Sequence, residues 1–297
     1  MPLLRAGAAL AAVLVLAACG SASPPPAGPS VVATTDVYGA VASAVGGDTA
    51  AVTSLIRSAD ADPHEYEPTP ADTLAVSRAT VFVANGGGYD DFATKLYDAA
   101  STKPVSVVVT ALSGFETDAP DFNEHVWYDL PTVKKLADYL ATALGAADQP
   151  NANRYLDNAK KFDAQVDGLI AKVQAIKAKH AGAKVAITEP VPGYLLQEAG
   201  LVVATPSGFS KAVEEGTDPP AAVVTANLAT FTGPGQVAVL VENAQTEGPT
   251  TTQAEQAAAA NGVPVVKVTE TLPAGVADYV TWMNRQVDAL ATALDAP

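Results

Sequence analysis

Cysteine and histidine are scarce in this chain. The sequence has one cysteine, Cys19, and three histidines among 297 residues. A lone cysteine excludes an intrachain disulfide. Charged residues are also few, at 16%, whereas hydrophobic residues make up 48%. A disordered chain has the opposite balance, so we expect a protein that folds around well-buried sheets.

Positive charge is in short supply as well. Lysine and arginine together number 17 against 32 aspartates and glutamates, which gives a formal net charge of −15. Such a surface repels the phosphates of nucleic acid and attracts cations. We therefore expect no nucleic-acid partner.

The longest apolar run lies near the N-terminus. Ala6 to Ala18 follows the basic Arg5 and is shorter than the roughly 20 residues of a membrane-spanning helix. Residues 1–18 are therefore predicted to be a signal peptide. Cys19 follows directly, and Leu-Ala-Ala-Cys resembles the bacterial lipobox, which implies that Cys19 is lipidated and becomes the mature N-terminus. The alternative is a cysteine that stands there by chance.

The mature chain alternates between strand and helix patterns. Apolar runs such as 31–35 and 80–84 are followed by amphipathic segments in the first half, and the alternation returns from Lys184 onward. Between the halves, Asn151 to His180 is one amphipathic stretch, predicted as a helix of about eight turns. The sequence therefore predicts an α/β fold with two similar lobes joined by a single long helix.

The length of the chain supports this division, because it is long for one compact domain and suits two lobes with a core each. The predicted parts are a signal peptide at 1–18, a lipidated tether at 19–30, an N-terminal α/β lobe at 31–147, a linker helix at 148–181 and a C-terminal α/β lobe at 182–297. The tether is rich in proline and small residues, which suits a connection between lipid and folded domain.

Markers of enzyme chemistry are missing from the sequence. There is no Gly-x-Ser-x-Gly turn and no His-Glu-x-x-His pair. The glycine run Asn85-Gly86-Gly87-Gly88 lacks the Lys-Ser/Thr of a phosphate-binding loop, so we predict a plain turn between strand and helix. We expect a protein that is not an enzyme.

Four potential metal ligands lie just beyond predicted strands or before predicted helices. His64 and His125 belong to the first half of the chain, and Glu189 and Glu270 to the second. Because ligands of α/β folds bind where strands end, we expect these side chains to converge in a cleft. Imidazole and carboxylate donors suit divalent zinc, manganese or iron. A solvated loop histidine is the plain alternative for His64, and Glu242 is a rival for the fourth position.

Four segments give the chain a family resemblance. They are Asp62-Pro63-His64-Glu65-Tyr66-Glu67-Pro68, Asn85-Gly86-Gly87-Gly88, Glu124-His125-Val126-Trp127-Tyr128-Asp129 and Glu214-Glu215-Gly216-Thr217. Together they resemble the zinc/manganese solute-binding lipoproteins of bacterial ABC importers, the cluster A-I family, and the likeness covers essentially all of the mature chain. The first segment is the most specific.

The resemblance implies a ligand set. His64 matches the family's first ligand and His125 the second. The third position holds His in zinc-type members and Glu in manganese-type members, and here it is Glu189. The fourth is usually Asp after the last strand, and here Glu270 fills the place, with Glu242 as the lesser rival.

The same resemblance implies a function. The protein is expected to capture one divalent transition metal in the cleft between its lobes and deliver it to an ABC permease in the membrane. It would work as a monomer outside the cytoplasm, anchored by lipid to the bacterial cell membrane.

The identity of the metal stays open between manganese and zinc. Glu189 favours manganese, and so does the segment from Leu112 to Asn123, which lacks the histidines that zinc-type members often carry there. Against this, most sites of nitrogen and oxygen donors bind zinc more tightly than manganese.

Two other functions use the same ligands. A zinc-dependent hydrolase would need an open coordination position and a general base, for which the sequence offers only Glu65 without a motif. The second alternative function is that of a metal-dependent surface adhesin. Around the site we interpret Trp127 as a wall of the cleft, Asp129 as an acceptor that orients an imidazole, and Trp282 as core.

Overall fold

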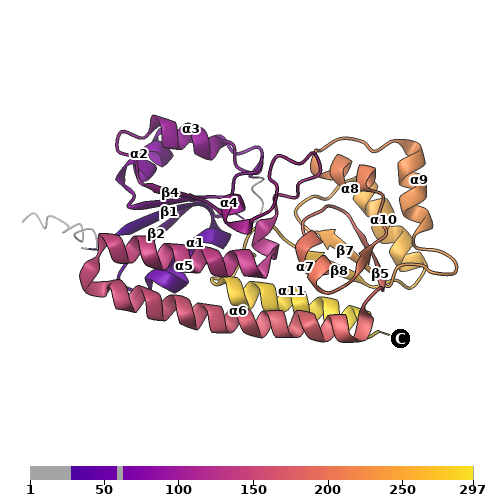
Figure 1. Cartoon of the computed structure of the whole chain (residues 1–297). Coiled ribbons are helices and arrows are strands. Elements are labelled where there is room, and N and C mark those ends of the chain that lie inside the picture. The colour runs from indigo at the N-terminus through magenta and orange to yellow at the C-terminus, as the bar shows by residue number, and fades with distance from the viewer. Residues whose placement is uncertain (1–27, 59–62, 297) are drawn as a thin grey trace, which may run out of the picture.

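The computed structural model describes residues 28–58 and 63–296. The predicted signal peptide, Cys19 and most of the predicted tether lie outside the described residues, as does Asp62 of the most specific segment. Within the described ranges no helix is long and apolar enough to cross a membrane. The chain forms two α/β lobes, one from each half of the sequence, with long helices running beneath both (Figure 1).

The N-terminal lobe is built on a four-stranded parallel sheet. In spatial order its strands are β2 (Ala51–Ile56), β1 (Ser30–Thr35), β3 (Val81–Ala84) and β4 (Val105–Val108). Val31 on β1 lies opposite Val52 on one side and Val81 on the other. Every residue of β3 is buried, because both faces of the sheet are covered by helices and the strand is apolar throughout.

Helices cover the two faces of this sheet. Their bounds are α1 (Asp36–Gly46), α2 (Pro70–Arg78), α3 (Phe92–Ala99), α4 (Val109–Ser113) and α5 (Leu130–Ala147). Thr69 and Asp72 form a capping box at the start of α2, and Asp129 accepts a hydrogen bond from the backbone of Thr132 at the start of α5. Strand β4 ends at Val108 because α4 begins at Val109.

The C-terminal lobe repeats the same topology. Its parallel sheet has the order β6 (Val202–Val203), β5 (Lys184–Ile187), β7 (Val239–Asn243) and β8 (Val265–Val268). In both sheets the second strand lies at one edge, the first lies next to it, and the third and fourth follow. This repeat confirms the expectation of two similar lobes.

The C-terminal lobe departs from the predicted elements after β5. The apolar run from Leu201 to Thr205 forms only a two-residue strand, Val202–Val203, beside β5, because Thr205 Oγ1 accepts the hydrogen bond from the Ile187 amide at 2.9 Å. The helices of this lobe are α7 (Gly193–Glu198), α8 (Ser207–Glu214), α9 (Ala221–Ala229) and α10 (Pro249–Ala260). Helix α8 was not predicted from the sequence.

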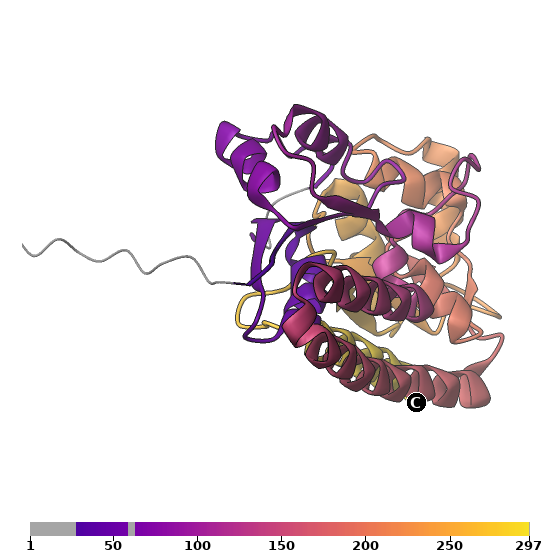
Figure 2. The ribbon, with the colours of Figure 1, turned by 60° about the vertical axis from the view of Figure 1, so that its left-hand side comes forward.

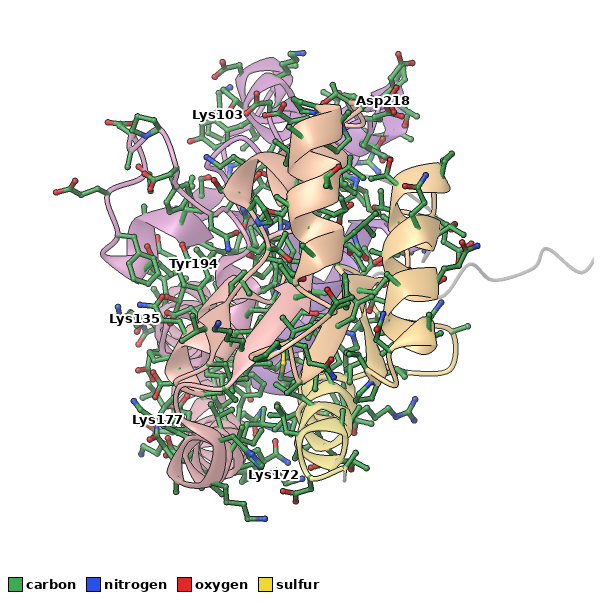
Figure 3. All side chains as sticks on the ribbon, turned by 90° about the vertical axis from the view of Figure 1, so that its right-hand side faces the viewer. Lys103, Lys135, Lys172, Lys177, Tyr194 and Asp218 are labelled. Carbon is green, nitrogen blue, oxygen red and sulfur yellow. The ribbon has the colours of Figure 1, made fainter. Side chains whose placement is uncertain are left out.

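The predicted long helix is present as α6 (Ala152–His180) and connects the lobes. The last helix, α11 (Tyr279–Leu294), lies beside it, and the two appear end-on below the sheet in Figure 3. Lys172 of α6 pairs with Asp288 of α11 at 2.7 Å. His180 pairs with Asp295 at 2.9 Å, so the third histidine belongs to this helix end.

One large hydrophobic core extends beneath both sheets. It includes buried faces of α1, α5, α6 and α11, and Trp127 and Trp282 are both 1% exposed within it. Two smaller clusters fill the opposite faces of the sheets, one in each lobe. The loop before α11 also contacts the N-terminal lobe, where Leu272 donates its backbone amide to Asp36, and α11 itself contacts α1 (Figure 2). The lobes are therefore joined by more than α6.

Candidate metal site

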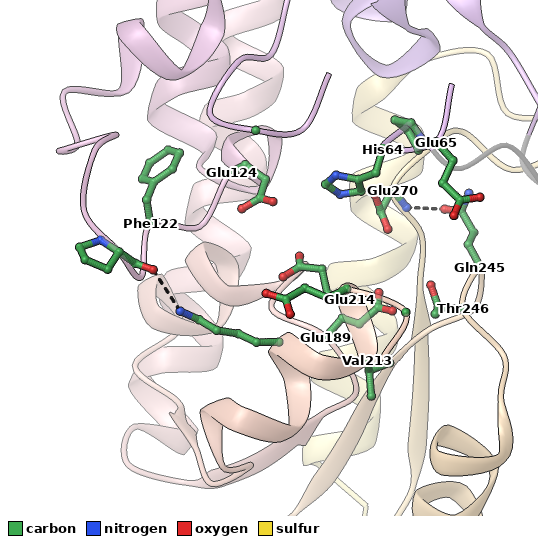
Figure 4. A pocket seen from close by; sticks show the side chains of 16 residues that line it. His64, Glu65, Phe122, Glu124, Glu189, Val213, Glu214, Gln245, Thr246 and Glu270 are labelled. Atoms are coloured by element: carbon green, nitrogen blue, oxygen red, sulfur yellow. Dashed lines mark hydrogen bonds between the residues drawn. The ribbon is translucent and has the colours of Figure 1, made fainter. Parts of the chain in front are cut away.

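A cavity of about 540 Å³ lies between the lobes. Three of the four predicted ligands, His64, Glu189 and Glu270, line it, and Figure 4 shows them around the open space together with Glu124 and Glu214. The remaining lining residues are Pro63, Glu65, Gly88, Pro120, Phe122, Lys211, Val213, Glu215, Gly216, Gln245 and Thr246. The cavity is therefore bordered by both halves of the chain.

His125 lies fully buried at the inner edge of this region. Asn123 Oδ1 accepts a hydrogen bond from the His125 amide at 3.1 Å and lies 2.6 Å from the ring Nδ1. An amide oxygen can only accept, so the ring proton sits on Nδ1 and the lone pair is on Nε2. Burial, followed by the nearby His64, lowers the pKa of His125 to about 3. The imidazole is thus neutral near pH 7, the form that binds metals.

The glycine turn holds the segment that carries His125. Asp90 accepts hydrogen bonds from the backbone amides of Asn85 at 2.7 Å and Gly86 at 2.8 Å. Gly86 has a φ of 76°, and an added Cβ would collide with Val108, so only glycine suits this position. Asn85 then donates from Nδ2 to the carbonyl of Glu124 at 3.0 Å. The turn therefore fixes the backbone next to His125.

His64 is exposed at the opposite side of the cavity. Its ring meets Tyr89 edge-on with centroids 5.1 Å apart, and Tyr89 in turn lies 6.0 Å from the His125 ring. Tyr89 is 1% exposed, so a buried ring packs against both imidazoles. The structure therefore places His64 in the lining of the cavity and His125 at its edge.

Glu189 and Glu270 come together at the carboxyl ends of the second sheet. Glu189 follows β5 and Glu270 follows β8, and β7 lies between these strands. Asn243, the last residue of β7, donates from Nδ2 to Glu189 Oε2 at 2.5 Å and to Glu270 Oε1 at 2.8 Å. One amide therefore joins the two carboxylates. Sequence reasoning missed Asn243, whose only signal was its place at a strand end.

The backbone at Glu270 is fixed from both lobes. Gln245 Oε1 accepts from the amides of Glu270 at 2.5 Å and Thr271 at 3.2 Å. Asp36, at the start of α1, accepts from the amide of Leu272 at 3.1 Å. The loop that carries the fourth predicted ligand is thereby held in place.

Glu214 also reaches this region, although the sequence reading did not place it among the ligands. Its Oε1 lies 3.4 Å from His125 Nε2. Glu124, His125 and Glu214 offer ligand atoms that all lie within 4.8 Å of one another. Burial raises the pKa of Glu214 to about 9, and the charges of Glu124 and Glu189 add to the effect. The motif Glu214-Glu215-Gly216-Thr217 contributed to the family resemblance, but it did not single out Glu214 as a ligand.

Two nearby acids have other partners. Glu242 is 1% exposed and lies 3.8 Å from Lys267, on the side of the sheet that faces Glu255. It does not line the cavity. Asp129 caps α5 through Thr132, so our interpretation of Asp129 as the acceptor for an imidazole was wrong, and Asn123 occupies that place instead.

The chain belongs to the family described as zinc-uptake complex component A, periplasmic (ZnuA), whose model matches residues 31–293. The fold agrees with a solved structure titled as the periplasmic zinc-binding protein TroA of Treponema pallidum. That structure has a TM-score of 0.75 and 17% identity, over 90% or more of both chains (91% of this chain and 100% of the other).

Two curated relatives carry names that differ in their metal. The manganese-binding lipoprotein MntA of Halalkalibacterium halodurans is 31% identical over 156 residues, which is 50% of this chain and 51% of the relative. The zinc-binding lipoprotein AdcA of Streptococcus pneumoniae is 26% identical over 280 residues, which is 84% of this chain and 53% of the relative. The chain spans about half the length of these curated relatives.

Proposed function

We propose that this chain is the extracytoplasmic metal-binding component of an ABC importer. It captures one divalent transition metal in the cavity between its lobes and delivers the metal to a membrane permease. The ligands are His64 and His125 from one lobe and Glu189 and Glu270 from the other. The observation that carries the proposal is the arrangement of the second pair, because one Asn243 amide joins both carboxylates beside the histidines.

Electrostatics support the capture of a cation. Acidic side chains crowd this cavity, and Glu189 is 2% exposed. Buried carboxylates that lie close together repel one another, and a divalent cation between them removes that cost. The net charge of −15 attracts cations to the protein as a whole.

Manganese and zinc are the two metals that we propose. The curated relatives include one protein named for each. Glu189 and Glu270 supply harder donors than imidazole and can bind through both oxygens, which suits the higher coordination number of manganese. Zinc is satisfied by four donors in a tetrahedron.

The remaining parts of the proposal concern how the chain is organised and held. Residues 31–147 and 182–297 form the two lobes, 148–181 the linker, and 19–30 a tether from lipidated Cys19 to the fold, after removal of the signal peptide. The curated relatives named above are lipoproteins that bind metal, which supports an anchored binding protein over an enzyme.

Native mass spectrometry of metal-free protein tests the binding function. With added manganese or zinc we expect one bound ion per chain. His64→Ala and His125→Ala should each weaken binding by about tenfold or more. His180→Ala is the matched control, because this histidine pairs with Asp295 at the end of α6 and should bind like the wild type. A wild-type chain that binds neither metal would overturn the proposal.

A further inference from the structure

Glu214 is held firmly at the wall of the cavity. It is the last residue of α8, whose buried Phe209 and Val213 pack into the hydrophobic cluster of the C-terminal lobe. One turn earlier, Lys211 donates from Nζ to the carbonyl of Pro120 in the other lobe at 3.4 Å. Lys211 thereby links α8 to the N-terminal lobe, and Glu214 at the end of the helix lies beside His125.

The facing atoms of Glu214 and His125 have no hydrogen bond to satisfy them within the described residues. His125 Nε2 and Glu214 Oε1 are both buried, and the distance between them is 3.4 Å. Because the His125 proton sits on Nδ1 beside Asn123, Nε2 is an acceptor, and Glu214 Oε1 is one as well when the side chain is ionised, the form that binds metal. Two buried acceptors that face each other are best satisfied by a cation.

We propose that Glu214 is a further metal-binding residue and that it sets the preference for manganese over zinc. This inference rests on the proposed function. The carboxylate of Glu214 adds a third carboxylate to the two of Glu189 and Glu270, so the donor set exceeds the four that tetrahedral zinc needs. Manganese favours a larger, oxygen-rich shell, and it gains more from the added donor.

Competition calorimetry with manganese and zinc tests the assignment. Glu214→Gln keeps the size of the side chain and cannot form the carboxylate that would bind metal. We expect manganese affinity to fall by about tenfold or more, with a much smaller loss for zinc. Glu215→Gln is the matched control, since Glu215 is the next residue, carries the same charge and lines the same cavity but is exposed. The ratio of its manganese and zinc affinities should match that of the wild type.

The outcomes separate this inference from the function on which it rests. If the wild type binds neither metal, the proposed function fails. If the wild type binds metal and Glu214→Gln keeps the same manganese-to-zinc ratio, Glu214 is not the selectivity residue, and the function stands. If Glu215→Gln loses as much manganese affinity as Glu214→Gln, the effect is a general one of charge, and the inference is also overturned.

A measurement on the wild type guards against a variant that does not fold. X-ray absorption spectroscopy of the manganese-loaded protein should show more light-atom ligands than the four of a tetrahedral site. Zinc-loaded protein should show fewer ligands than manganese-loaded protein. A four-coordinate manganese shell would contradict the role of Glu214.

Discussion

Asn243 carries no charge, yet it holds together the two carboxylates of the candidate site. Its amide donates to both Glu189 and Glu270, so it neutralises part of their mutual repulsion in the metal-free protein. Asn243→Asp replaces the donor with a third carboxylate. We expect the metal-free variant to melt below the wild type and to gain more in melting temperature from metal, as measured by differential scanning calorimetry.

Asn243→Ala provides the comparison for this prediction. It removes the hydrogen bonds to Glu189 and Glu270, together with those that the side chain makes with Thr246 and with the Gln245 amide, and it adds no charge. Its melting temperature should therefore fall less than that of Asn243→Asp. If the two variants melt alike with and without metal, repulsion between the carboxylates does not govern the site.

Asp36 gives a prediction for the effect of pH on stability. Burial raises the pKa of Asp36 from 3.8 to about 6, against hydrogen bonds from the backbone amides of Leu272 and Val37 that lower it. A carboxyl with a raised pKa in the folded state contributes stability below pH 3.8, and that contribution is lost as the pH rises through about 6. Asp36→Asn keeps the acceptor for Leu272 and cannot ionise.

Chemical denaturation of the metal-free wild type and of Asp36→Asn between pH 4 and pH 7 checks this expectation. The wild type should lose stability relative to the variant across that interval, around its folded pKa of about 6. A constant difference between the two proteins would mean that Asp36 does not titrate in this range.

At this scale the sequence predicted which residues gather at the cavity better than it predicted the side chains that hold them. His64, Glu189 and Glu270 line one cavity, with His125 at its edge, because strand ends and loops of α/β lobes meet in clefts and a motif marked each histidine. Asn123 and Asn243 were not predicted, since an amide gains its role from neighbours that are distant in the sequence. Glu214 was missed for the same reason, as its contact depends on where α8 ends.

The long helix α6 shows how elements follow from local pattern. Its buried residues recur at helical spacing from Tyr155 to Ile176, and the sequence alone predicted its extent to within a residue or so at each end. Short elements were harder to predict. Strand β6 is cut short by the Thr205 side chain, and α8 has only eight residues, which is a short window for recognising a helical period.

A glycine inside α6 offers a test at the scale of the element. Gly168 is exposed in the helix, and an added Cβ would meet nothing within 4 Å. Gly168→Ala should therefore raise the free energy of unfolding by about 1 kcal/mol, because glycine is the poorer helix former. Metal affinity should stay unchanged.

Gly200→Ala is the contrasting variant in the same denaturation experiment. Gly200 has a φ of 67°, and an added Cβ would lie 3.0 Å from Cγ of Lys177. This substitution should destabilise the protein. If both variants shift stability in the same direction, the backbone geometry assigned to these glycines is wrong.

On the scale of the whole molecule, hydrogen bonds between the lobes suggest a stiff joint. Tyr128 donates to the carbonyl of Thr269 at 2.7 Å, and Tyr279 donates to the carbonyl of Trp127 at 2.7 Å. Tyr194 donates to the carbonyl of Asn123 at 2.6 Å. Together with the core shared along α6 and α11, these contacts resist large rotations of one lobe against the other.

Small-angle X-ray scattering checks that stiffness. The radius of gyration of the metal-free and metal-loaded protein should differ by less than about 1 Å, as expected for a largely preformed site. A contraction of several ångströms on loading would show hinge closure instead.

The most direct test of the account is a crystal structure of the metal-loaded protein with anomalous diffraction at the manganese or zinc edge. We predict a single strong anomalous peak inside the cavity between the lobes, within bonding distance of His64, His125, Glu189 and Glu270. A peak beside Glu242 and Lys267, a peak elsewhere on the surface, or no peak at saturating metal would contradict the central claim.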